Sequence, residues 1–196
     1  MRANATRTRR SPSLVVAAAV VVVALLALAV STERGQAELE DLLPVLAAPQ
    51  TAGDRVPEGV DLATLGALEP DSVRRVEGRD SDAQYWVGTT ASNEVCLILH
   101  LPENDGATAS SCAPVSSFDE RGVPIRVSGT GGSAEAYLLP ADVDTSTLPP
   151  ALIEVTGPAG AVGATLVSPR PGAAGSLQPT QLERRGGDSF AFVPLR

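Results

Sequence analysis

The sequence contains no lysine, and its 196 residues include only one histidine, two cysteines and one tryptophan. A Walker-type phosphate loop needs a lysine after its glycines, so the glycine-rich run at residues 128–133 is expected to form a turn instead. A zinc or other transition-metal site needs several histidine or cysteine ligands, and this chain has too few to supply them. No metal site and no cofactor are therefore predicted.

Catalysis through a histidine would have to use His100, which falls within a predicted strand. The chain has no Gly-x-Ser-x-Gly elbow to supply a serine nucleophile. Two carboxylate pairs, Asp80 with Asp82 and Asp142 with Asp144, lie in loops, but neither has the spacing of an EF-hand. No catalytic residue is assigned on this basis. Because paired carboxylates can hydrolyse glycosides, an envelope hydrolase is the alternative function.

Charge is divided unevenly along the chain. Residues 1–13 carry four arginines and no acid, whereas residues 31–196 carry 11 arginines and 23 acids, a net charge of 11 − 23 = −12. A surface of this sign repels phosphate backbones and anionic lipid headgroups, so nucleic acid is not expected as a partner. A cationic ligand or a basic envelope protein fits this charge better.

An uncharged apolar run, LVVAAAVVVVALLALAV, occupies residues 14–30. As a helix it spans about 25 Å, which just suffices for the hydrocarbon core of a bilayer. The arginines before it and the acids after it place the N-terminus in the cytoplasm. We therefore predict a basic cytoplasmic tail at 1–13, a transmembrane signal anchor at 14–30 and an extracytoplasmic remainder, in a single-pass protein of the cell membrane. Cleavage after Ala29 is the alternative and would give a secreted protein.

Residues 31–60 are acidic, are interrupted by three prolines and lack sustained periodicity, which predicts a Pro-rich linker of low order. One or two helical turns fit before Pro44, but isolated helices of that length are marginal in water. Asp61 is placed to cap a short turn that leads into the folded domain.

Residues 61–196 are predicted to form one extracytoplasmic β domain. Eight short β-type runs follow one another, with turn residues and no long helical period between them. The runs are SVRRVEG, AQYWVGTT, EVCLILHL, VPIRVSG, AEAYLLP, LIEVTG, AVGATLVS and FAFVPL. Their spacing predicts a mainly β fold, either a small antiparallel sandwich or a partly open barrel. Residues 115–120 are expected to make a turn at most.

The run EVCLILHL predicts a strand with Val95, Leu97, Leu99 and Leu101 on its core face. A turn follows, and a hairpin centred on residue 104 sets Cys96 opposite Cys112. In an exported chain two cysteines oxidise together, and the loop of roughly 15 residues stabilises the fold by about 3 kcal/mol in the chain-entropy account. A redox-active pair is disfavoured, since no Cys-x-x-Cys is present.

Tyr85 and Trp86 form the only adjacent aromatic pair. Alternation along a strand places one ring inside and the other outside. Packing in the core is the favoured role of Trp86, and an exposed role of Trp86, with Tyr85, as a candidate contact residue is the alternative.

Several phrases occur in a fixed order after the anchor: PQTAGDRVP, EPDSVRRV, YWVG, EVCLIL, a second cysteine and GVPIRVSG. In this order the chain resembles a group of uncharacterised, membrane-anchored exported proteins of actinobacteria. The resemblance spans most of the chain and implies the same topology, without an activity. Together these observations predict an extracytoplasmic binding or interaction module of the cell envelope.

Overall fold

The computed structural model describes residues 38–76, 82–103, 105–155 and 163–196. The predicted tail at 1–13 and the predicted anchor at 14–30 lie outside these ranges. Within them, no helix has the length and apolar character needed to cross a membrane. The compact unit that holds the sheets runs from Leu39 to Arg196, and it is described here by itself.

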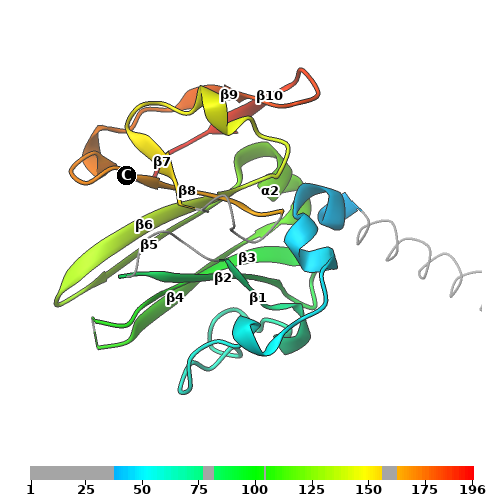
Figure 1. Ribbon diagram of the computed structural model, residues 1–196, viewed down its shortest axis with the longest axis vertical. Helices are drawn as coiled ribbons and strands as arrows, with labels where there is room; N and C mark the ends of the chain where they lie inside the picture. Colours follow the sequence, from blue (N-terminus) through cyan, green and yellow to red (C-terminus); the bar gives the residue numbers. More distant parts are fainter. Residues whose placement is uncertain (1–37, 77–81, 104, 156–162) are drawn as a thin grey trace, which may run out of the picture. The chain divides into compact units, whose positions relative to one another are not determined.

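Two four-stranded antiparallel sheets and one two-stranded ribbon make up this unit (Figure 1). The first sheet has the order β1 (Arg74–Val76), β2 (Gln84–Thr89), β3 (Glu94–Leu101), β4 (Ala107–Pro114). The second has the order β5 (Val123–Gly129), β6 (Gly132–Leu139), β8 (Thr165–Pro169), β7 (Leu152–Glu154). The ribbon pairs β9 (Thr180–Glu183) with β10 (Ser189–Phe192). The mainly β prediction is confirmed, and the described strands form no closed barrel.

Helical structure is sparse. Five 3-10 turns are present among the described residues: η1 (Pro44–Ala47), η2 (Ala52–Asp54), η3 (Pro70–Ser72), η4 (Thr145–Thr147) and η5 (Ala174–Ser176). A seven-residue helix, α2 (Val115–Arg121), joins β4 to β5, where we had expected a turn at most. This expectation was wrong because Phe118 is fully buried in the core and holds the short helix in place. The helix ends at Gly122, whose φ of +71° and close approach to the Leu138 carbonyl require glycine.

The two larger sheets share one hydrophobic core. Val95, Leu97, Leu99 and Leu101 of β3 all contribute to it, which confirms the predicted core face of this strand. The second sheet contributes Val123, Ile125, Val127, Ala136, Leu138 and Leu166.

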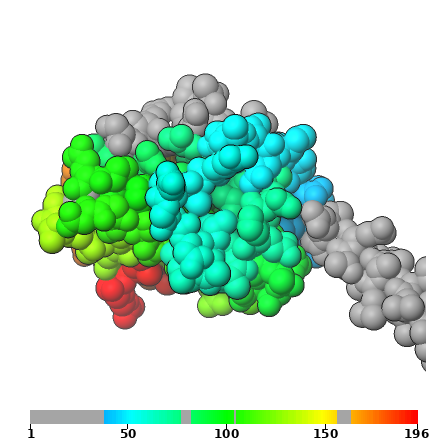
Figure 2. All heavy atoms as spheres, turned by 90° about the horizontal axis from the view of Figure 1, so that it is seen from below, coloured from blue at the N-terminus to red at the C-terminus, as the bar shows by residue number. Residues whose placement is uncertain are grey.

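The opposite face of the first sheet is also covered. Residues 56–73, which we call the cover segment, pack Leu68 and Val73 against Trp86, Cys96 and Ile98. Figure 2 looks onto this face, where blue-green atoms lie beside the green atoms of the sheet. Strand β3 is consequently buried on both of its faces.

The folded unit begins well before residue 61. Leu39, Leu43 and Val45 are buried in the shared core, and residues 38–42 are helical. The Val45 amide donates to the Gly163 carbonyl at 3.2 Å, and the Ala141 amide donates to the carbonyl of Leu42 at 2.8 Å. The predicted linker at 31–60 therefore does not match the structure from Leu39 onward. Burial against the core supplies the stability that so short a helix lacks in isolation.

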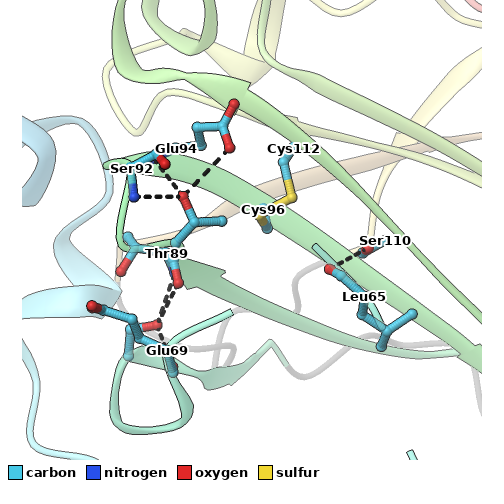
Figure 3. The surroundings of a disulfide bond; sticks show 10 residues. Leu65, Glu69, Thr89, Ser92, Glu94, Cys96, Ser110 and Cys112 are labelled. Carbon is cyan, nitrogen blue, oxygen red and sulfur yellow. Dashed lines mark hydrogen bonds between the residues drawn. A yellow bond between two sulfur atoms is a disulfide. The ribbon is translucent and has the colours of Figure 1, made fainter. Parts of the chain in front are cut away.

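Cys96 and Cys112 lie directly opposite each other in the register of β3 and β4 and form a disulfide, as predicted (Figure 3). Beside it, the Ser110 hydroxyl donates to the Leu65 carbonyl at 2.6 Å. This bond ties the cover segment to β4.

Replacement of Leu43 by alanine tests whether residues 39–46 belong to the fold. Because the side chain is fully buried, the cavity left behind is expected to lower the free energy of unfolding by about 2–5 kcal/mol. Val193→Ala is the control, since Val193 is 49% exposed, and a change of about 0.5 kcal/mol or less is expected there. Urea unfolding of the full chain measures both. Equal effects of the two variants would mean that residues 39–46 form a tether.

Candidate functional site

A cleft of about 420 Å³ lies where the cover segment meets the turn between β3 and β4. Its charged lining consists of the exposed carboxylates Glu58, Asp61 and Asp105, and no arginine lines it in the described part of the chain. The other lining residues are Gly59, Val60, Thr64, Leu65, His100, Gly106 and Thr108. The cleft is thus negatively charged and carries the only histidine of the protein at its wall.

Hydrogen bonds fix the turn that carries Asp61. The Asp61 carboxylate accepts from the Ala63 amide at 2.9 Å, which confirms the capping turn predicted there. The Thr64 hydroxyl donates to the Asp61 carbonyl at 2.8 Å. On the other wall, Asp105 and Gly106 have positive φ values of 54° and 69° and form the tight turn of the hairpin. Two short turns therefore position carboxylates on both walls of the cleft.

His100 is buried to 8% exposure beneath this cleft. Its Nδ1 lies 2.7 Å from the Thr108 hydroxyl, and that hydroxyl donates to the Gly106 carbonyl at 2.9 Å. Since the hydroxyl has one proton, Nδ1 is the donor of the first bond and carries the ring proton. Burial lowers the pKa of His100, and the nearby Gly106 carbonyl opposes this shift only in part. The neutral form is therefore favoured at neutral pH.

The cleft is not built to chelate a metal. Among the described residues, no three His, Cys, Asp or Glu side chains converge closely enough to hold an ion. The three carboxylates instead surround an open volume, which suits an organic cation such as a guanidinium or ammonium group.

The predicted carboxylate pair Asp142 and Asp144 forms no acid–base pair in the structure. The Asp142 carboxylate accepts two bonds from Arg184, at 2.7 and 2.9 Å, and Arg184 also bonds to Asp119 at 2.6 Å. These bonds, that to Asp142 foremost, raise the pKa of the Arg184 guanidinium. Asp144 caps the turn η4 by accepting from the Ser146 amide at 2.9 Å. The other pair is not described, because Asp80 lies outside the described residues.

Tyr85 and Trp86 lie on opposite faces of the first sheet, as alternation predicts, but both rings are buried. Trp86 is 1% exposed under the cover segment, so it has no surface to present to a partner. The core packing favoured for Trp86 is therefore confirmed, and its alternative role as an exposed contact residue does not match the structure. The cover segment, which we had assigned in part to a linker, occupies the face of the sheet on which the Trp86 ring lies.

A second cleft, of about 400 Å³, lies beside β6 and β8 and includes Arg126, Glu135 and Arg170. Arg126 pairs with Glu135, and Arg170 Nε donates to the Pro150 carbonyl at 2.6 Å. Glu135 is buried and accepts from Arg126 Nε at 2.7 Å and from the Tyr137 hydroxyl. Burial and this bond raise the pKa of Tyr137, whose oxygen also accepts from the Leu195 amide at 3.0 Å. The bond from Leu195 to Tyr137 holds the C-terminal segment in place. The buried Glu135 is thus paired within the fold, which gives it a structural role.

No protein family, curated protein or solved structure matches this chain. The resemblance to anchored actinobacterial proteins stays a prediction.

The sequence patterns did not predict the acidic cleft, although Asp61 had been assigned as a cap and His100 as a strand residue. Glu58 fell within the predicted linker, and Asp105 was treated as part of a turn signal. The usable signal was the strong negative charge of residues 31–196, which indicated a cationic partner without showing where it binds. Only the packing of the cover segment on β3 and β4 brings these acids together.

Replacement of the sole histidine by asparagine tests the environment of His100. The unfolded chain has the ordinary histidine pKa of about 6.5, whereas burial lowers the pKa in the folded state. Below about pH 6.5 the folded state therefore binds fewer protons than the unfolded state. As a result, the free energy of unfolding falls as the pH drops from there toward the lowered pKa. The slope is at most about 1.4 kcal/mol per pH unit.

Asparagine keeps a donor near Thr108 but does not titrate. Urea unfolding is measured at a series of pH values between neutral pH and the onset of carboxylate titration. In the wild type the free energy of unfolding should decline over this range as the pH falls, and in His100→Asn this decline should be lost. A variant with an unchanged pH profile would contradict this placement of His100.

Proposed function

We propose that this protein is a membrane-anchored binding module of the cell envelope, whose extracytoplasmic domain takes a cationic ligand or a basic segment of an envelope protein into the acidic cleft. The observation that supports this proposal most strongly is the lining of that cleft. Three carboxylates, Glu58, Asp61 and Asp105, surround one open volume, with no arginine among the lining residues that the structure describes.

Charge on the rest of the chain supports this choice of ligand. Residues 31–196 have a net charge of −12, which attracts cations over a Debye length of about 8 Å at physiological salt. Cations would thus be concentrated near the domain and then held at the cleft, which three carboxylates line.

The location rests on the N-terminal sequence. The arginine-rich tail at 1–13 and the apolar run at 14–30 are the features of a signal anchor that leaves the C-terminal domain outside. The disulfide between Cys96 and Cys112 is typical of an oxidising, exported environment. A linker between the anchor and Leu39 would hold the domain near the membrane surface.

The alternative of a paired-carboxylate hydrolase gains no support from the described residues. Hydrolysis of a glycoside needs two carboxylates facing a common substrate, whereas Asp142 is ion-paired with Arg184 and Asp144 caps a turn. A binding role needs only the charged and open cleft.

Binding of a fluorescent, acetylated and amidated penta-arginine tests the proposed function. The full chain is placed in nanodiscs of zwitterionic lipid at about 0.15 M salt, which limits long-range attraction. The double variant Glu58→Gln/Asp105→Asn should bind roughly tenfold more weakly, because each partly exposed ion pair contributes up to about 1 kcal/mol. Fluorescence anisotropy gives both dissociation constants.

The matched control is Glu183→Gln/Asp188→Asn, which removes the same charge from exposed residues of the β9–β10 ribbon. It should keep nearly all of the affinity. Equal weakening by the two double variants, or no binding of penta-arginine to the wild type, would contradict a cation-binding cleft.

A further inference from the structure

Strand β4 is the free edge of the first sheet. Its residue Cys112 lies opposite Cys96 with a Cα–Cα distance of 4.0 Å, which identifies the narrow, non-hydrogen-bonded type of antiparallel pair. Because pair types alternate, Thr108 and Ser110 belong to the same type. The backbone N–H and C=O groups of these three residues therefore point away from β3, along the outer edge of the sheet.

These outward groups are unoccupied within the described part of the chain. All ladder pairing of β4 is with β3, and no other backbone or side-chain hydrogen bond reaches the amides or carbonyls of Thr108, Ser110 or Cys112. The residues of the strand are half-buried along most of its length, and none is fully buried.

The edges at β1 and β5 are protected in ways that β4 is not. On β1, the Arg75 amide donates to the Asp54 carboxylate at 2.8 Å, so that edge is already occupied. On β5, Pro124 has no N–H and Arg126 brings a charge, two features that block pairing with a further strand. The sequence of β4, ATASSCAP, has no charge and no proline before its last residue. An edge of this kind is a template for an added strand.

We propose that the partner is an extended basic polypeptide segment that adds to β4 as an antiparallel fifth strand and places alternate arginine or lysine side chains in the acidic cleft; this rests on the proposed function of that cleft. Antiparallel pairing is the pattern of every sheet in the structure. A second copy of this chain is disfavoured as the occupant, since two domains of net charge −12 repel each other.

The acidic cleft and the free edge of β4 lie close enough for one peptide to contact both. The Thr108 side chain lines the cleft, and the Ser110 hydroxyl bonds to Leu65, another lining residue. In antiparallel pairing, the partner residues that bond to Thr108, Ser110 and Cys112 have their side chains on this same face. Those partner positions are therefore the basic ones, and the residues between them lie on the side of Ala109 and Ala113.

The test uses the heptapeptide Arg-Thr-Arg-Thr-Arg-Thr-Arg, acetylated and amidated, with the full chain in zwitterionic nanodiscs. Methylation of the arginine backbone nitrogens keeps the charge but removes the N–H groups that would bond to β4. Methylation of the threonine nitrogens affects the opposite edge and is the matched control. Arginine methylation should weaken binding at least about tenfold relative to the control, because several main-chain bonds are lost.

Two protein variants distinguish the effect of the edge N–H group from the effect of the bond to the cover segment. Ser110→Ala and Ser110→Pro both lose the hydroxyl bond to Leu65, but only proline removes the outward N–H. Proline should abolish the difference between the two methylated peptides, whereas alanine should preserve it. Hydrogen exchange should slow at the amides of Thr108, Ser110 and Cys112 when the unmodified peptide binds.

Equal affinity of the two methylated peptides, with no change in exchange along β4, would overturn strand addition and leave the cleft as a simple cation site. Absence of binding by any arginine peptide would overturn the proposed function as well. A third outcome would be slow exchange of the same amides without peptide, in a protein that sediments as a dimer. This would overturn the basic segment as the occupant of the β4 edge in favour of a second copy of the chain.

Discussion

The burial of β3 on both of its faces is the constraint on which the rest of the structure depends. A strand that reads Val-Cys-Leu-Ile-Leu from Val95 to Leu99 exposes apolar groups on either side and cannot lie at the surface of a single sheet. The second sheet covers one face, and the cover segment at residues 56–73 covers the other. The acidic cleft lies where the cover segment meets the turn between β3 and β4. The packing that buries the second face of β3 therefore also forms the cleft.

Local patterns predicted the strands well, because each of the eight apolar runs contains a strand of the structure. The disulfide followed from hairpin symmetry and from the presence of only two cysteines in a chain predicted to be exported. The strand β9 was missed since only Leu182 of its four residues is buried. The helix α2, the fold of residues 39–60 and the burial of Trp86 all depend on contacts with distant parts of the chain, and short-range patterns do not report such contacts.

Edge protection differs among the strands of the two larger sheets. Proteins commonly protect a free edge with lysine, proline or a covering segment. Here β1 and β5 are protected in this way, by Asp54 and by Pro124, and β4 is not. A strongly negative domain repels its own copies and favours basic partners, so the same charge that disfavours aggregation would select the ligand that we propose.

Acrylamide quenching of tryptophan fluorescence tests the two-sided burial of β3 most directly. Trp86 is the only tryptophan of the chain, and it lies under the cover segment beside Ile98. In the full chain we expect a blue-shifted emission that acrylamide quenches far less than it does in the urea-unfolded protein. Emission and quenching close to those of the unfolded chain would show that the outer face of the first sheet is open, and would contradict the cover segment and the cleft built from it.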